Sequence, residues 1–277
     1  VHVSGDVYAI VNCDNGGGYG TIWTVTIDSD GNISDSAIDT WLFAPGNYAF
    51  QGFLVKVNGS ADIFALCCVI AGTQIFTFKI ADNGTITKSK IDNLIVNTGW
   101  SYQDRHSFCH VTGTTYAVVH VRSIDSEGIC EIVDIDTLGN IGSVLDNEKF
   151  ETRWNVSNFP SIMQYKESLY VIMYQYYGLT DADCRVVLKT MNISASQVTG
   201  PVGSLELTGI TRASARSLSI ENCVDFGFNG VAVGCVPNGG TDGIVITVSI
   251  TDAGSMVQRD CKTVTTGGAG DIIKTHV

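Results

Sequence analysis

The sequence has few charged residues, and among these the basic ones are scarce. Charged side chains make up 16% of the 277 residues, and 16 Lys and Arg stand against 28 Asp and Glu, for a net charge of −12. Such a chain repels a phosphate backbone, which excludes nucleic acid as a partner. No apolar run approaches the roughly 18 residues of a membrane-spanning helix, and no basic and apolar leader precedes Val1. We therefore expect a soluble mature chain, or a segment of a longer one, without membrane insertion.

The cysteines lack the spacing of a metal site or of a disulfide ladder. There are nine, with Cys67 and Cys68 as the only close pair and no CxxC motif. Most fall in expected strands, where a free thiol acts as a small apolar side chain, and one or two disulfides are the alternative. Together with the acidity, the N-x-S/T sequons fit an extracellular or cell-surface location. The same sequences are also typical of turns. The sequons lie at Asn32, Asn58, Asn83, Asn155 and Asn192.

The residues that are abundant are typical of a β-protein. The chain has 30 glycines, and its apolar runs are rich in Val, Ile, Thr, Tyr and Phe. One such run recurs, as YAIV (8–11), IFALCC (63–68), YAVV (116–119), YVIM (170–173) and VAVG (231–234). Each copy follows a short strand and a turn, and the turns end at Gly5, Gly59, Gly113, Glu167 and Gly230. The first three steps are 54 residues and the last is 63, so the chain is a repeat protein.

Each repeat contains four expected strands. Residues 21–26 alternate with period two, and the turns DSDGNI, ADNGTI and DTLGNI place glycine where a hairpin needs a positive φ. A four-stranded sheet that is apolar on both faces is covered by its neighbours when the sheets pack around an axis. We therefore predict a single all-β domain, 1–277, forming a five-bladed β-propeller of repeats 1–52, 53–106, 107–160, 161–222 and 223–277. The end, DIIKTHV, resembles the start, so we expect the C-terminal strand to join the first blade and close the ring.

The pattern GDVYAIV, TVTIDSDGNISDSAID and DIIKTHV resembles the β-propeller repeat segments of large bacterial and archaeal surface proteins. The resemblance covers nearly the whole chain, and it is weakest in the fourth and fifth repeats, where ISAS and TDAG replace the Gly-Asn turn. It implies the propeller fold and a structural or adhesive role. It carries over no catalytic residue.

Propeller geometry predicts that the loops after the fourth and the second strand of each repeat share one face. The first set of loops is rich in aromatic and polar residues that suit a sugar, because ring faces pack on C–H groups while polar groups bind hydroxyls. The alternative is that the aromatic residues wedge between blades. The predicted ligand-binding residues are Tyr48, Trp100, Tyr102, Asp104, Arg105, His106, Arg153, Trp154 and Asn155.

The sequence offers two weaker candidate ion sites, and each has a simpler alternative explanation. No other cofactor is expected. Acidic loops could hold Ca²⁺ through Asp125 and Glu127 or through Asp181 and Asp183, whereas the favoured reading is solvated turns. When the first strands of the repeats are aligned, three histidines fall at the same position. They could form a metal or anion site, or they could line a water-filled channel. These histidines are His2, His110 and His276.

The composition and motifs favour a non-enzymatic extracellular module that recognises a glycan or a protein. We expect it to be a monomeric domain within a larger chain. The alternative is a glycoside hydrolase with axial carboxylates, for which Asp104, Glu221, Asp225 and Asp271 are available but no pair stands out. A spacer without a ligand is a third reading. Nucleophile elbows and His-based metalloprotease motifs are absent.

Overall fold

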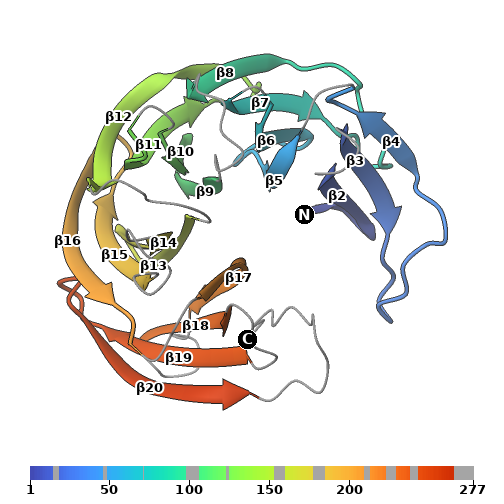
Figure 1. Cartoon of the computed structure of the whole chain (residues 1–277). Helices are drawn as coiled ribbons and strands as arrows, with labels where there is room; N and C mark the ends of the chain where they lie inside the picture. Colours follow the sequence, from blue (N-terminus) through green and yellow to red (C-terminus); the bar gives the residue numbers. More distant parts are fainter. Residues whose placement is uncertain are drawn as a thin grey trace. The chain divides into compact units, whose positions relative to one another are not determined.

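A computed structural model describes most of the chain and shows an all-β protein (Figure 1). The described residues are 1–14, 19–45, 49–70, 72–97, 106–122, 125–152, 160–176, 185–208, 213–222, 229–237 and 243–264. Within these ranges there is no helix, and twenty strands form five antiparallel sheets of four strands each. The expectation of four strands per repeat is confirmed.

In every sheet the strands follow one another in chain order. The first sheet contains β1 (His2–Ser4), β2 (Val7–Asp14), β3 (Tyr19–Thr26) and β4 (Asp39–Leu42). The second contains β5 (Phe50–Lys56), β6 (Ile63–Val69), β7 (Thr73–Lys79) and β8 (Asp92–Asn97). The third contains β9 (His106–Thr112), β10 (Thr115–Val121), β11 (Gly128–Ile135) and β12 (Ile141–Glu151).

The last two sheets follow the same plan. The fourth contains β13 (Ser161–Lys166), β14 (Leu169–Tyr176), β15 (Arg185–Ile193) and β16 (Val198–Glu206). The fifth contains β17 (Ala213–Asn222), β18 (Gly230–Pro237), β19 (Gly243–Ile250) and β20 (Met256–Val264). The chain divides into two compact units, residues 1–118 with 132–145 and residues 119–131 with 146–277.

The turns between the first two strands end at the predicted residues in the first four sheets, and these residues share a left-handed conformation. Gly5, Gly59 and Gly113 have φ values of +52°, +75° and +55°. Glu167 takes the same position in the fourth sheet with a φ of +47°, which an L side chain adopts only at a cost. The 54-residue spacing therefore marks one recurring left-handed turn.

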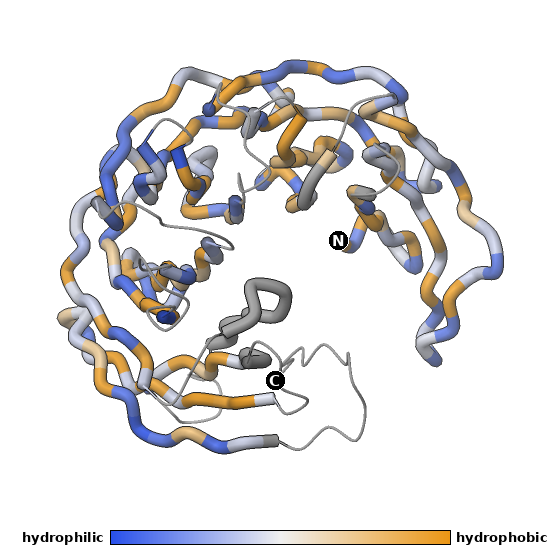
Figure 2. Tube along the Cα trace, in the orientation of Figure 1, coloured by the Kyte–Doolittle hydropathy of each residue, from blue (hydrophilic) through white to orange (hydrophobic). Residues whose placement is uncertain are grey.

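The middle strands are buried on both faces, as the apolar runs predicted. Every residue of β6 and of β10 is buried. In Figure 2 the hydrophobic colour follows the second and third strands of the sheets, while hydrophilic residues are frequent on the fourth strands. Within the first unit, one apolar cluster joins the first and second sheets and another joins the second sheet to β9, β10 and β11. Within the second unit, a cluster joins the fourth and fifth sheets.

Two kinds of hydrogen bond join consecutive sheets within the units. In the first, a threonine hydroxyl of the third strand donates to a glycine carbonyl in the next sheet's hairpin. The pairs are Thr24 to Gly84 at 2.7 Å, Thr77 to Gly139 at 2.5 Å and Thr190 to Gly254 at 2.7 Å.

In the second, a fourth-strand carboxylate accepts from a backbone N–H of the next sheet. The pairs are Asp39 with Ile86 at 2.9 Å, Asp92 with Ile141 at 2.8 Å and Asp146 with Val198 at 2.9 Å. We call these contacts the threonine clasp and the aspartate clasp.

The first sheet takes its first strand from the start of the chain. β1 pairs with β2 in an antiparallel ladder, with His2 opposite Tyr8. Residues 271–277, expected to close the ring, lie outside the described residues, so closure by that segment stays a prediction. In the part of the chain that the structure covers, no helix has the length and apolar character needed to cross a membrane.

Candidate functional site

The strand registers place two kinds of connection at the same end of a sheet. In the fourth sheet, Tyr176 at the end of β14 pairs with Arg185 at the start of β15. Ser161, which begins β13, pairs with Met173 near that end of β14, and Glu206, which ends β16, pairs with Val187. The connections into β13, from β14 to β15 and out of β16 therefore share one end, which we call the loop end. The short hairpins lie at the opposite end.

Most predicted ligand-binding residues lie outside the described residues. These are Tyr48, Trp100, Tyr102, Asp104, Arg105, Arg153, Trp154 and Asn155. The same holds for His276, for the acidic residues Asp181, Asp183, Asp225 and Asp271, and for the side chain of Glu221. Their roles stay predictions.

His106 is the predicted ligand-binding residue that the structure describes, and its side chain is buried. It begins β9, its Nε2 lies 3.0 Å from the backbone oxygen of Cys67, and its ring meets Phe53 edge to face. These contacts tie the start of the third sheet to the second sheet within the first unit. The binding site proposed below therefore does not include His106 and consists of residues from the predicted loops.

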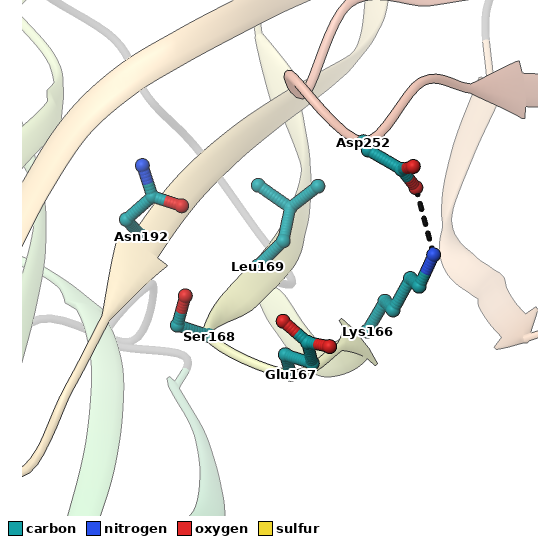
Figure 3. A pocket seen from close by; sticks show the side chains of 6 residues that line it. All are labelled: Lys166, Glu167, Ser168, Leu169, Asn192 and Asp252. Carbon is teal, nitrogen blue, oxygen red and sulfur yellow. Dashed lines mark hydrogen bonds and ion pairs between the residues drawn. The ribbon is translucent and has the colours of Figure 1, made fainter.

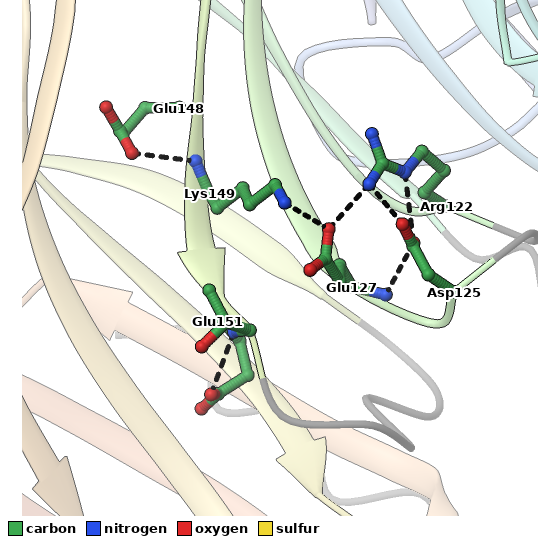
Figure 4. A network of polar contacts seen from close by, with 7 residues as sticks. Arg122, Asp125, Glu127, Glu148, Lys149 and Glu151 are labelled. Atoms are coloured by element: carbon green, nitrogen blue, oxygen red, sulfur yellow. Dashed lines mark hydrogen bonds and ion pairs between the residues drawn. The ribbon is translucent and has the colours of Figure 1, made fainter.

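The described loop end of the second unit contains a network of two cations and two carboxylates (Figure 4). Glu127 Oε2 lies 2.6 Å from Arg122 Nη2 and 2.6 Å from Lys149 Nζ. The Arg122 guanidinium also binds Asp125 through two nitrogens, and the Asp125 carboxylate accepts the Glu127 N–H at 3.2 Å. The network joins the end of β10, the start of β11 and β12.

The charges in this network compensate one another. The hydrogen bond from Arg122 lowers the pKa of Asp125, and the same contact raises the pKa of Arg122. Because Arg122 and Lys149 occupy the carboxylate oxygens of Asp125 and Glu127, the cation needed there is already present in the chain. Ca²⁺ would have to displace both side chains to bind this pair.

Another acidic side chain near this end is buried. Glu151, the last residue of β12, accepts a hydrogen bond from the Tyr174 hydroxyl at 2.5 Å and from the Thr152 N–H at 3.0 Å. Tyr174 is fully buried and packs against Phe150, with ring centroids 5.1 Å apart. The pair therefore anchors the end of β12 to β14.

The aligned histidines of the first strands bind their own hairpins. His2 Nε2 lies 2.8 Å from the Gly5 oxygen, and His110 Nε2 lies 3.0 Å from the Gly113 oxygen. Gln164 replaces histidine in the fourth sheet and donates to the Glu167 oxygen at 2.5 Å. In these three sheets the polar residue thus satisfies a turn carbonyl, whereas Lys56 at this position in the second sheet donates to the Val3 oxygen at 2.7 Å. Among the described residues, no three His, Cys, Asp or Glu side chains gather in a way that could hold a metal ion.

The hairpin end of the second unit has a small open pocket (Figure 3). Lys166 forms an ion pair with Asp252 at 2.9 Å on one side of it, which raises the pKa of Lys166. The lining residues are Lys166, Glu167, Ser168, Leu169, Asn192 and Asp252. Its lining is mostly polar, and Lys166, the cation among these lining residues, is already paired with Asp252.

Sequence reasoning singled out Asp125 and Glu127 of the network but missed Arg122, Lys149 and the buried Glu151. Arg122 precedes Asp125 by three positions and Glu127 by five, a spacing that lets one loop fold back on its own arginine. That signal was available. The contribution of Lys149 and the burial of Glu151 depend on how β12 and β14 pack, which local spacing does not reveal.

Fold and site together define an all-β repeat protein of four-stranded antiparallel sheets with a charge-compensated loop end. No protein-family model matches the chain, and no curated protein sequence matches it. Among solved structures, an endo-1,4-beta-xylanase from Bacteroides thetaiotaomicron is 13% identical with a TM-score of 0.46, covering 95% of this chain and 96% of the other.

Two further structures are similar over most of this chain. A neuraminidase-like protein of A/little yellow-shouldered bat/Guatemala/060/2010 is 9% identical with a TM-score of 0.42, over 78% of this chain and 60% of that one. A glycoside hydrolase is 12% identical with a TM-score of 0.34, over 97% and 65%. This chain thus spans less than two thirds of either protein. At such TM-scores a likeness assigns no activity.

Proposed function

We propose that the five sheets are the blades of a five-bladed β-propeller whose loop end binds a glycan. In this proposal the chain is a non-enzymatic module of the extracellular space or the cell surface. The observation that supports binding over hydrolysis is the pairing of the described acidic groups at the loop end. Asp125 and Glu127 bind Arg122 and Lys149, and Glu151 is buried against Tyr174.

A hydrolase needs the opposite arrangement. Two carboxyl groups must face the same substrate, at about 5 to 9.5 Å from each other, with at least one of them reachable by water. Of the described carboxylates of this end, Asp125 and Glu127 are held by cations and Glu151 lies in the core. They are suited to fixing loops in place, which lowers the entropy that a binding loop loses when its ligand arrives.

The network lies next to the predicted aromatic residues in the chain. Lys149 and Glu151 fix the end of β12, and Trp154 follows Glu151 by three residues. Trp100 follows Asn97, the last residue of β8, by the same interval. Each tryptophan therefore follows closely on the end of a fourth strand, and each offers a ring face to a sugar.

Glycan-array binding tests this function. The natural chain should bind a defined group of glycans, and Trp100→Ala and Trp154→Ala should each weaken binding at least tenfold, about 1.4 kcal/mol. Leu138→Ala is the control, because Leu138 is exposed on a hairpin at the other end and should leave binding unchanged. Hydrolysis of aryl glycosides that Asp271→Asn abolishes would replace the proposal with the hydrolase. Silent arrays would favour a protein ligand or a spacer.

A further inference from the structure

The pocket at the hairpin end of the second unit is lined by polar side chains that are available to a ligand. Its volume is about 210 Å³, below the roughly 300 Å³ at which pockets for drug-sized ligands begin. Glu167, Ser168 and Asn192 line it, and in the described part of the chain their side chains make no hydrogen bond or ion pair. The pocket therefore suits a small group that brings its own hydrogen bonds.

The walls of the pocket come from the fourth and fifth sheets. Leu169 begins β14 and pairs with Asn192 of β15, so the two side chains share the face that packs against the fifth sheet. The threonine clasp from Thr190 to the Gly254 carbonyl, at 2.7 Å, holds the hairpin of the fifth sheet on this face. Asp252 of that hairpin lines the pocket. Contacts of the chain itself thus fix the walls, which lowers the cost of binding a ligand.

The charges of the lining leave one carboxylate without a cation. Lys166 is paired with Asp252 at 2.9 Å, so the charge of Glu167 is the uncompensated one. Figure 3 shows the Glu167 carboxylate and the Ser168 hydroxyl on the same side of their turn, with Asn192 across from Ser168. A carboxylate, a hydroxyl and an amide oxygen, all hydrogen-bond acceptors, therefore border one space. A cation with several N–H donors matches them.

The second sheet has a lysine where the fourth sheet has Asn192. Lys79 pairs with Ile63 in the ladder as Asn192 pairs with Leu169. The Lys79 ammonium group binds the carboxylate of Asp62, the residue before Ile63, at 3.2 Å. In the second sheet the chain therefore supplies an ammonium group to a carboxylate next to this strand. The fourth sheet keeps a carboxylate in the turn but has no lysine at this position.

Glu167 places its carboxylate in the pocket at a cost to the backbone. Its φ is +47°, whereas glycine takes the same turn position in the first three sheets. Gln164 donates to the Glu167 backbone oxygen at 2.5 Å and so stabilises the turn. Strained backbone of this kind clusters at ligand sites, where a particular side chain is needed. The strain agrees with a role for the carboxylate.

We propose that this pocket binds a primary ammonium group carried on an alkyl stem. The Glu167 carboxylate, the Ser168 hydroxyl and the Asn192 amide oxygen accept its three N–H donors, and the stem packs on Leu169. The net charge of −12 attracts such a cation. The pocket lies at the hairpin end, opposite the loop end, so the inference does not depend on glycan binding.

Titration with n-butylammonium chloride at constant ionic strength, followed through backbone amides by NMR, tests the proposal. The amides of Glu167, Ser168 and Asn192 should shift together along one saturating curve, with a Kd of about 1 mM or below. 1-Butanol, which has a similar shape without the charge, should leave them unchanged. Shifts that stay linear with concentration, or that 1-butanol reproduces, overturn the proposal.

A second titration, with Nα-acetyl-lysine amide, identifies the source of the ammonium group. Both sources carry the proposed chemistry. Tighter binding than n-butylammonium supports the site as one for a lysine side chain of a peptide, and weaker binding supports it as one for a free amine. Saturation by neither ligand overturns the proposal.

Three variants separate the site from general attraction of cations. Glu167→Gln should weaken n-butylammonium binding at least tenfold, because it removes the unpaired charge. Asn192→Lys should do the same, because it supplies the lysine of the second sheet and fills the pocket. Asp82→Asn is the control, because it removes one charge from an exposed hairpin of the first unit and should leave binding unchanged. Urea midpoints check that each variant folds. Unchanged binding by Glu167→Gln, or an equal loss in Asp82→Asn, overturns the proposal.

Discussion

At the scale of single residues, Glu167 occupies a turn position that suits glycine. Its φ of +47° matches that of Gly5 and Gly113. A left-handed conformation costs an L residue about 1 to 2 kcal/mol. Glycine avoids this cost but loses more conformational entropy on folding, which offsets about half of the gain. Glu167→Gly should therefore raise the free energy of unfolding by about 0.5 to 1 kcal/mol, measured as a higher urea midpoint. Glu167→Ala is the control, and an equal gain there would contradict this explanation.

The hydrogen bond between Tyr174 and Glu151 offers a second test at this scale. Removing the hydroxyl leaves a buried carboxylate with one donor fewer, which costs about 1 to 3 kcal/mol. Tyr174→Phe should lower the urea midpoint accordingly. Tyr165→Phe is a matched control, because Tyr165 donates to the neutral carbonyl of Ile250 at 3.1 Å and should cost less. Equal losses in the two variants would show that the carboxylate's charge contributes nothing.

At the scale of elements, the aspartate clasp makes the contact between the first two sheets sensitive to acid. A hydrogen bond from Lys88, followed by the Ile86 N–H, lowers the pKa of Asp39 below its ordinary value of 3.8. The folded-state pKa lies below the unfolded one, so the ionised carboxylate stabilises the fold above that value. This stability is lost as pH falls through the folded pKa.

Urea unfolding measured from pH 7 down to about pH 2 tests this effect. The natural chain should lose stability below about pH 4, and Asp39→Asn should start lower at pH 7 and lose less in acid. Asp35→Asn, a change in an exposed turn, should follow the natural profile. A profile of Asp39→Asn parallel to that of the natural chain would remove Asp39 as a source of the acid sensitivity.

At the scale of the whole molecule, the repeated units were predictable and the contacts between them were not. The turns at Gly5, Gly59 and Gly113 and the buried middle strands follow from spacing and apolar runs, which act locally. The buried thiols Cys67 and Cys68 are likewise free, as a strand interior predicts. By contrast, the repeat alignment placed His2 and His110 at the same position but could not predict where their side chains point. In the structure each histidine contacts the backbone oxygen of its own turn.

The same limit applies to the candidate site. Lys149 and Glu151 both belong to β12, and only the packing of β12 beside β11 and β14 brings their partners Glu127 and Tyr174 within reach. A sequence pattern reports which residue types occur and at what interval. It does not report which charges compensate one another, and that pairing is the observation from which binding is proposed over hydrolysis.

If the chain binds glycans as proposed, the acidity of the whole molecule limits which glycans can bind. A net charge of −12 repels sulfated or carboxylated sugars, and Arg122, Lys149 and Arg185 at the described loop end are already paired. On the proposed function, arrays at low ionic strength should show binding to neutral glycans and little to polyanionic ones. Raising the salt from about 20 to 300 mM should leave neutral ligands unaffected, because screening acts on charge alone. Strong binding to heparin-like chains that weakens with salt would mean that cationic residues of the loop end outside the network determine recognition.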